Sequence, residues 1–482
     1  MSHATAPATF PPTGTTGQPV RRWLVLAICC LSVGVTGINL SIVNVALPSI
    51  GRELHAEVTS LQWVVSIYSL VMACFLMLSG SMADRFGRKR IFQTGLVLFA
   101  AGSLACSLAP SVGWLIGFVA IQAIGGSMLN PVAMSIIAGV FTDRAERAKA
   151  IGVWGSVIGV TIAIGPVLGG LLVDGVGWRS VFWISVPLGI LALVLTGVFV
   201  PESKAARARR FDLPGQLLII VMFASVIAAT IEGPRRGWGD GWIIALFALA
   251  AFALAAILLV EPRRREPLIE LRFFRSPPFT GANGISLLMT ASLGGLLFLS
   301  TLYLQDARGF TPLQAGLTII PLAAAQAIAA NVSGRLVAAH RDRAALALGG
   351  GLIALGAFGL VFLTVRTDIV YVLAAFAVFG LGAGLIGPPV SHTAISGLPA
   401  DQTGVAGAIA ASARQFGSAI GVAVTGSLVT TTGAGFIDSS HVAWAVLTAA
   451  GLAALVLALI STNTWARNAA TRNGEHLAAA HG

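Results

Sequence analysis

Long apolar stretches dominate the chain, and each is about as long as a membrane-spanning helix. About 20 mostly apolar residues cross roughly 30 Å of hydrocarbon, and stretches of this kind recur between residues 23 and 462. Short polar or basic segments separate them, so we expect fourteen helices. The predicted ranges are 23–48, 60–82, 91–109, 114–141, 148–173, 179–200, 214–233, 241–260, 279–304, 313–338, 344–365, 370–396, 403–431 and 441–462.

The composition agrees with a membrane protein. Hydrophobic residues make up 56% of the 482 residues and charged residues only 10%, with a mean hydropathy of +0.87, whereas soluble domains carry about 25% charged residues. Many stretches contain glycine or proline, which neighbouring helices tolerate in a membrane bundle. The first stretch exceeds the roughly 7–15 residues of a signal-peptide core, so we expect a retained helix behind a disordered tail.

The basic residues fall mostly on one side of the predicted topology. With the N-terminus in the cytoplasm, 23 of the 30 lysines and arginines lie in cytoplasmic segments, six lie in outer loops, and Arg414 lies within a helix. Cytoplasmic loops of membrane proteins carry this excess. We therefore expect a multi-pass protein of the plasma (inner) membrane with both termini in the cytoplasm.

The net charge of +11 does not indicate a nucleic-acid partner, because the basic residues are spread over many loops rather than gathered in one patch. Membrane lipids are the expected partner of these loops, since anionic head groups attract them. No protein partner is predicted.

A weak internal repeat divides the chain. The segment Gly80–Arg88 after the second helix is matched by Gly334–Asp342 after the tenth, and duplicated halves are typical of secondary transporters. The predicted division is a cytoplasmic tail (1–22), a six-helix half (23–200), a linker with two extra helices (201–278), a second six-helix half (279–462) and a cytoplasmic tail (463–482).

The segment 80–90 places one acid among four bases, between spaced glycines. Gly80 and Gly87 permit a tight turn. Asp84 would suit the positive N-terminus of a neighbouring helix. The alternative is that the segment only determines topology.

This segment resembles the loop between helices 2 and 3 of the major facilitator superfamily. Residues 159–170, which read GVTIAIGPVLGG, resemble its antiporter signature. Three further segments resemble the 14-helix drug:proton antiporter branch of this superfamily. They are residues 44–48 (NVALP), 178–189 (Trp-Arg-Ser-Val-Phe and a later Pro-Leu-Gly) and 312–316 (PLQAG). The resemblance covers about residues 23–462. It implies an all-α integral membrane fold with 14 transmembrane helices in two six-helix halves plus two linking helices.

The resemblance also implies a conformational gate and a hinge. Asp84 would contact the start of the helix near residues 401–404, and Arg88 would pair with Asp143, in one of two states. The antiporter segment would form a hinge or seal that governs the direction of export. The alternative is that its glycines only form a tight helix-packing face, and the two interpretations are compatible. The hinge residues are Gly159, Gly165, Pro166, Gly169 and Gly170.

Two positions depart from the branch pattern. Its members usually carry an aspartate five residues before the Asn-Val-Ala-Leu-Pro run, where this chain has Asn39, and an arginine where it has Val119. An expected proton carrier and its cationic partner are therefore both replaced. The remaining candidates for proton coupling are Glu232, Asp306 and His392, with Asp174 and Asp240 as further acids near the outer face; ordinary loop or helix-end roles are the alternative.

Polar and aromatic residues within the apolar helices are candidates for a substrate cavity near the membrane midplane. Each could equally cross-link helices. Arg414 lies about 16 Å into its helix and is either an anchor for an anionic group or gating charge, or a hydrogen-bond hub to backbone carbonyls. The cavity candidates are Asn39, Asn44, Tyr68, Gln122, Asn130, Trp154, Asn283, Gln326, Asn331 and Arg414.

The motifs of other function classes are absent from the sequence. It holds no Walker-type nucleotide loop, Gly-x-Ser-x-Gly or His-Glu-x-x-His segment, and its four cysteines have no metal-type spacing. We therefore expect no enzyme, cofactor or metal site. A receptor would normally add a soluble domain, and paired gates and hinges favour a transporter over a channel without excluding one.

The predicted function is a secondary active transporter that exports small hydrophobic or cationic compounds, such as drugs and antibiotics, by alternating access, with protons as the coupling ion. Because Asn39 and Val119 replace the charged pair, the alternative is an uncoupled facilitator, or an exporter dedicated to one metabolite or natural product.

Overall fold

The computed structural model describes residues 21–205, 212–264, 267–395, 403–429, 435–463, 465–466 and 468–469. Helices dominate this part of the chain, and it contains no strand. Within it, thirteen helical segments are long and apolar enough to cross a membrane. The segment that carries Arg414, α15 (Thr403–Leu428), makes fourteen. The all-α expectation and the helix count are confirmed.

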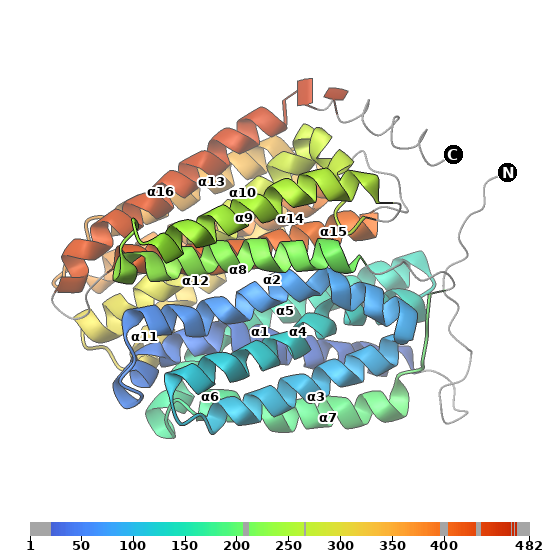
Figure 1. The fold of residues 1–482 in the computed structure, drawn as a ribbon, viewed down its shortest axis with the longest axis horizontal. Coiled ribbons are helices and arrows are strands. Elements are labelled where there is room, and N and C mark those ends of the chain that lie inside the picture. Colours follow the sequence, from blue (N-terminus) through green and yellow to red (C-terminus); the bar gives the residue numbers. More distant parts are fainter. Residues whose placement is uncertain are drawn as a thin grey trace.

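The helices form two halves joined by a linking pair (Figure 1). The N-terminal half contains α1 (Arg22–Glu53), α2 (Val58–Phe86), α3 (Arg88–Ser107), α4 (Val112–Val140), α5 (Arg144–Gly175), α6 (Ser180–Trp183) and α7 (Ser185–Phe199). The linking pair is α8 (Leu213–Arg236) and α9 (Gly241–Val260), followed by the short 3-10 helices η1 (Glu261–Arg263) and η2 (Leu271–Arg275). The C-terminal half contains α10 (Pro277–Thr301), the π-helix η3 (Leu302–Ala307), α11 (Pro312–Thr318), α12 (Ile320–Ala338), α13 (Asp342–Leu360), α14 (Ile369–Ile395), α15 and α16 (Phe436–Ser461).

Two predicted helices are divided in the structure, and a third ends well before its predicted end. The stretch 179–200 divides at Ile184, and the stretch 313–338 divides at Ile319. The helix predicted for 344–365 ends at Leu360, because Thr364 and Thr367 bond to each other in a turn instead of continuing the helix.

Each half is held by its own helix pairs. In the N-terminal half α3 packs on α4, α1 on α5 and α2 on α4; in the C-terminal half α12 packs on α14, α10 on α15 and α13 on α14 and α16. The two halves meet where α2 packs on α15 and where α5 packs on α11.

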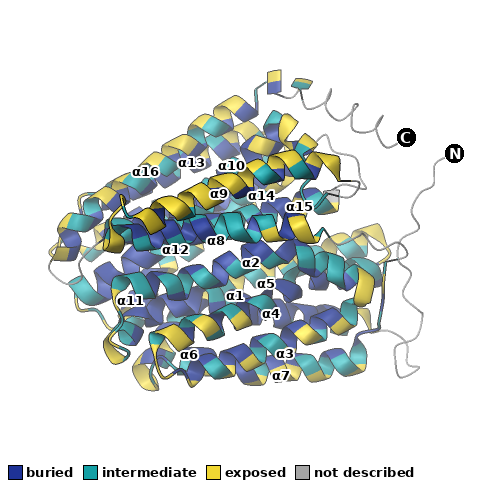
Figure 2. Ribbon diagram, in the orientation of Figure 1, coloured by how far each residue is buried: buried dark blue, intermediate teal, exposed yellow. Residues whose placement is uncertain are grey.

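The linking helix α8 covers the line along which α2 and α15 meet. It contacts both of them, while α9 packs on α8 and presents most of its other side chains at the surface (Figure 2). The apolar side chains at this junction are Leu70 and Cys74 of α2, Ile227 and Ile231 of α8, and Ala419 and Ala423 of α15. We call this cluster the α2–α8–α15 junction.

The two ends of the bundle differ. We call the end that carries the loops at Gly87 and Thr142–Asp143, the start of α8 and the segment 267–276 the basic end, and the other the opposite end. Within the described chain, polar contacts between the halves gather toward the opposite end. They are Ser66 to Ala419, Gln305 to Val45, Leu313 to Asp174 and Arg52 to Asp306.

Small residues bring α5 and α11 into backbone contact at the opposite end. A Cβ atom on Gly170 would lie 2.5 Å from the Leu313 Cα, and one on Gly316 would collide with the Pro166 carbonyl. Only glycine fits such a separation. This contact closes the opposite end.

We expect a glycine-to-alanine substitution on α5 to lower the melting temperature at Gly170, which lies in this contact, but not at Gly159. Gly170→Ala forces the Leu313 backbone to move, and overpacking of this kind costs about 1–3 kcal/mol, so we expect a lower melting temperature of the purified protein. Gly159→Ala is the matched control, because a Cβ there meets nothing within 4 Å and alanine gains about 1 kcal/mol of helix propensity over glycine. Equal melting temperatures for the two variants would contradict the proposed tight seal.

Candidate functional site: the central cavity

A cavity of about 1400 Å³ lies between the halves. It exceeds the roughly 300–1,000 Å³ of typical small-molecule pockets. It reaches toward the basic end, where Gly80 and Gly404 line it and a Cβ on either glycine would meet nothing within 4 Å. Since the contacts between the halves gather toward the opposite end, the cavity is open toward the basic end.

Eight of the ten predicted cavity residues line this cavity. They come from α1, α2, α4, α5, α12 and α15, and they are Asn39, Asn44, Tyr68, Gln122, Asn130, Trp154, Gln326 and Arg414. The structure therefore brings together polar residues that lie up to 375 positions apart in the sequence.

Asn39 and Gln122 form a neutral pair where the branch pattern has charges. The Asn39 amide donates to Gln122 Oε1 and the Gln122 amide donates to Asn39 Oδ1, both at 3.2 Å. Gln122 also donates to Ser103 Oγ at 2.7 Å. Val119 lies beside this network and is buried. The two amides thus line the cavity and cross-link α1, α3 and α4 without any charge.

Other polar atoms at the cavity lack a protein partner. Asn44 Oδ1, Asn130 Oδ1 and Trp154 Nε1 are buried and make no hydrogen bond. Leaving such a group unpaired costs about 1–3 kcal/mol. A bound substrate or water could supply the missing partners.

Arg414 lies at the cavity wall on α15. Among the described residues it forms no ion pair with an acid, and no hydrogen bond from it to a backbone carbonyl is found. The geometry leaves its guanidinium free to face the contents of the cavity.

Two predicted cavity residues lie elsewhere, which corrects the prediction. Asn283 is buried and donates to the Phe279 carbonyl at 2.8 Å. Asn331 is exposed and donates to the Ala327 carbonyl at 2.8 Å. Each amide nitrogen donates to its own helix, one turn earlier, on a face that does not border the cavity.

The three candidates for proton coupling also lie outside the cavity lining. Glu232 accepts a hydrogen bond from Trp63 Nε1 at 3.0 Å and pairs with Arg235 at 2.8 Å. Asp306 pairs with Arg52 at 3.6 Å. The His392 Nδ1 atom lies 3.1 Å from an Asp342 carboxylate oxygen. Of the other outer acids, Asp174 accepts from the Leu313 amide and Asp240 caps α9.

The predicted gate residues are placed as follows. Gly87 has a φ of +114°, which favours glycine, and Arg88 pairs with Asp84 at 3.1 Å. Asp143 caps α5 by accepting from the amides of Ala145 and Glu146. Asp84 lines the same cavity as Gly404, while residues 401–402 lie outside the described part. The pairing of Arg88 with Asp143 stays a prediction for another state.

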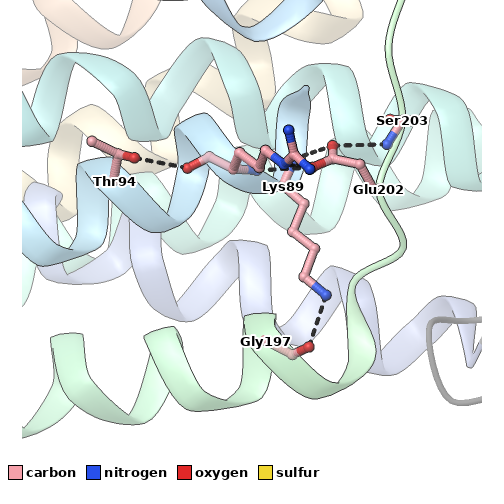
Figure 3. Close-up of polar contacts among 6 residues, drawn as sticks. Lys89, Thr94, Gly197, Glu202 and Ser203 are labelled. Atoms are coloured by element: carbon pink, nitrogen blue, oxygen red, sulfur yellow. Dashed lines mark hydrogen bonds and ion pairs between the residues drawn. The ribbon is translucent and has the colours of Figure 1, made fainter. Parts of the chain in front are cut away.

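Sequence reasoning missed Glu202, which fixes the gate loop to the linker (Figure 3). Its carboxylate accepts from the amides of Lys89 at 3.0 Å and Arg90 at 3.3 Å. An acid at a helix N-terminus is favourable. A Cβ on Gly87 would lie 2.6 Å from the same carboxylate, so Gly87 is required for this cap as well as for its backbone conformation. The only sequence signal was an acid directly after a predicted helix.

The predicted hinge has two different parts. Gly165, Gly169 and Gly170 pack against Ser41, Ile42 and Leu313 respectively, and Pro166 lies against Gly316. Gly159, nearer the basic end, has open space beside it. The tight part therefore lies where the halves are closed, whereas Gly159 is exposed and does not line the cavity.

Three acids border the cavity toward the basic end. Asp84 was singled out from the sequence, but Asp212 and Glu270 were not, because both lie in linkers that were read only for their basic residues. Asp212 caps α8 by accepting from the Gly215 amide at 3.0 Å, and Gln216, next on α8, also lines the cavity.

Comparisons with known proteins agree with this geometry. Residues 29–422 match the Major Facilitator Superfamily. The multidrug resistance protein Stp of Mycobacterium tuberculosis is 38% identical over 412 residues, which cover 85% of this chain and 76% of that protein. The methylenomycin A resistance protein of Streptomyces coelicolor is 34% identical over 419 residues, which cover 87% of each.

A solved structure shows the same fold. The peptide transporter POT in complex with sulfate superposes with a TM-score of 0.69 over 97% of each chain, at 17% sequence identity. The many apolar helices, the two halves around a cavity and the sequence matches lead to one conclusion: this chain is a multi-pass transporter, not an enzyme, and it belongs to the Major Facilitator Superfamily.

Proposed function

We propose that this protein exports small, mainly hydrophobic drug-like compounds from the cytoplasm by alternating access, driven by protons. The observation that carries the proposal is the large cavity with orphaned polar atoms that opens toward the basic end. By the positive-inside rule that end faces the cytoplasm, from which an exporter loads. The names of the relatives, which refer to multidrug and antibiotic resistance, support the same cargo class.

The cavity wall indicates the chemistry of the cargo. Apolar side chains such as Leu40, Met72 and Leu293 would hold a hydrophobic body, and the amides of Asn44 and Asn130 would orient its polar groups. Arg414 adds one positive charge to the wall. A neutral or anionic polar group suits a position beside it, and a cationic compound would bind with its charge directed toward Asp84 and the other acids at the mouth.

Alternating access requires contacts that differ between two states. The state described here closes the opposite end through α5 and α11. In the second state we expect Asp84 to reach the start of α15 and Arg88 to pair with Asp143, which would close the basic end.

A second candidate is export without protons. The neutral pair of Asn39 and Gln122 favours it, because it removes the acid on which coupling in the branch is expected to depend. The following measurement separates the two.

Efflux of a fluorescent hydrophobic dye should collapse when a protonophore dissipates the proton gradient in cells that express the protein. The reason is that proton-driven export against a dye gradient needs the free energy of proton entry. Cells with the empty vector are the control. Continued uphill efflux without the gradient would overturn proton drive, and the absence of any efflux for a panel of drug-like compounds would overturn the proposed cargo class.

Arg414→Ala should weaken export of a compound that carries a carboxylate or another strong acceptor. A hydrogen bond to a charged group contributes about 1.5–3 kcal/mol, so the apparent affinity should fall about tenfold or more. Concentration-dependent efflux measures this, at matched expression. Asn331→Ala is the control, because Asn331 lies outside the cavity. Unchanged affinity in Arg414→Ala would exclude Arg414 as a substrate anchor.

Alternating access also predicts a state-dependent distance between Gly80 of α2 and Gly404 of α15. Both face open space here and should approach each other when the basic end closes. Cysteines at both positions should therefore form a cross-link that increases under conditions that favour the second state. Gly80→Cys alone is the control, since the four native cysteines are buried. A cross-link yield that never changes would contradict the rocking motion.

A further inference from the structure

Two acids outside the recognised motifs meet at the linkers of the basic end. Glu261, on η1, is 1% exposed. Its Oε2 atom lies 3.4 Å from the Ile269 amide that donates to it, while Oε1 is buried and has no donor among the described residues. Asp212 uses Oδ1 to cap α8, while its Oδ2 atom is buried and likewise has no donor in the described part of the chain.

The two free oxygens face each other across Gly215. A Cβ on Gly215 would collide with Glu261 Oε1 and lie 2.9 Å from Asp212 Oδ2, so both oxygen atoms border the same small space beside Gly215. Glycine at position 215 therefore makes room for both acids.

One proton shared by the two carboxyl groups would give both buried oxygen atoms a hydrogen-bond partner. Two ionised carboxylates offer only acceptors, so both buried oxygens would stay unpaired while the charges repel. A proton on one acid supplies a donor to the other and removes one charge. Such a pair titrates as a unit.

In the described part of the chain, no basic side chain takes the place of that proton beside the two carboxyl groups. No described basic residue forms an ion pair with Asp212 or Glu261. Arg263 donates to the Leu259 carbonyl, and Arg272 lies 3.8 Å from Glu270. The charged groups on the neighbouring described segments are Asp84 and Arg85 of α2, Arg263 and Arg264 at η1, Glu270, and Arg272 and Arg275 of η2.

The pair has access to the cavity and joins the two ends of the linking pair. Asp212 lines the cavity beside Gln216 and Leu268, so a proton can exchange with its water. The linker 200–212 leads from the N-terminal half, and the linker 261–276 leads into the C-terminal half. A bond between Asp212 and Glu261 therefore joins the start of α8 to the end of α9, where the chain from the N-terminal half enters the linking pair and the chain to the C-terminal half leaves it.

We propose that Asp212 and Glu261 bind one proton between them and exchange it with the cytoplasm through the cavity, so that export depends on cytoplasmic pH. This inference rests on the proposed function and names a proton site for it. Release sends the proton to cavity water and leaves two carboxylates that repel each other; uptake restores the hydrogen bond. The proton-bound pair holds the linkers as they are here, and the ionised pair favours a state in which they separate.

Infrared difference spectra of the full-length protein in lipid nanodiscs test proton binding. The wild type should show the carbonyl band of a protonated carboxyl group that disappears as the pH is raised. Glu261→Gln should lack it, because the glutamine amide donates to Asp212 in place of the proton and keeps the contact. Glu146→Gln, which removes a partly exposed acid of the basic end that does not line the cavity, should retain the band. An unchanged band in Glu261→Gln would overturn the proposal.

Dye transport into everted membrane vesicles tests whether export depends on cytoplasmic pH, because the cytoplasmic face of the protein is then exposed to the bath. With the pH difference across the vesicle membrane held constant, so that the driving force does not change, wild-type and Glu146→Gln transport should fall as the bath is acidified, and Glu261→Gln should lose this dependence. Asp212→Asn should lose it too, and it keeps the α8 cap because asparagine also caps helices.

The outcomes distinguish this inference from the proposed function. If the wild type transports no drug-like dye, the proposed function fails, and the infrared titration alone decides whether the pair binds a proton. If the wild type shows the pH dependence and both Glu261→Gln and Asp212→Asn retain it, the inference fails while the proposed function stands.

Discussion

The backbone contact between α5 and α11 is the constraint on which the rest of the arrangement depends. Lipid provides no hydrophobic force between helices, so close packing of small residues must hold them together. Gly170 and Gly316 allow that approach at the opposite end only. The contact is tight at this end of α5, whereas Gly159, nearer the other end, has open space beside it. The large cavity follows from this asymmetry.

The electrostatics of the cavity follow from its depth. An ionised group within the membrane is costly unless it is paired or meets water. The amides of Asn39 and Gln122 avoid that cost, since each satisfies the other. The acids that border the cavity, Asp84, Asp212 and Glu270, lie toward its open end, where water reaches them. Arg414 is the exception, and its position at the wall makes it the strongest electrostatic feature that a bound molecule would meet.

The sequence allowed most of the fold to be predicted, because each membrane pass needs its own long apolar stretch. The breaks at Ile184 and Ile319 could not be predicted, since the neighbouring helices decide where a pass divides. Of the ten residues chosen for polarity within an apolar stretch, eight line the cavity. This criterion failed for Asn283 and Asn331, because a polar side chain can bond to its own helix on any face.

Contacts between distant segments were the main omission. Glu202 lies 113 residues from Lys89, and Glu261 meets Asp212 through the folding of two linkers. Both linkers are rich in arginine, so their acids looked like ordinary surface residues in the sequence. Only the burial of their oxygen atoms sets them apart, and burial is a property of the packed helices.

The α2–α8–α15 junction has a consequence for compounds that dissolve in the bilayer. Such a molecule has a second conceivable route into the cavity, sideways from the lipid through a gap between the halves. Along the stretch where Leu70 and Ala419 meet, Ile227 of α8 fills the lipid side of that gap. The linking pair thus acts as a wall against lateral access on this flank, and a lipid-dissolved molecule would have to use another flank or the aqueous mouth.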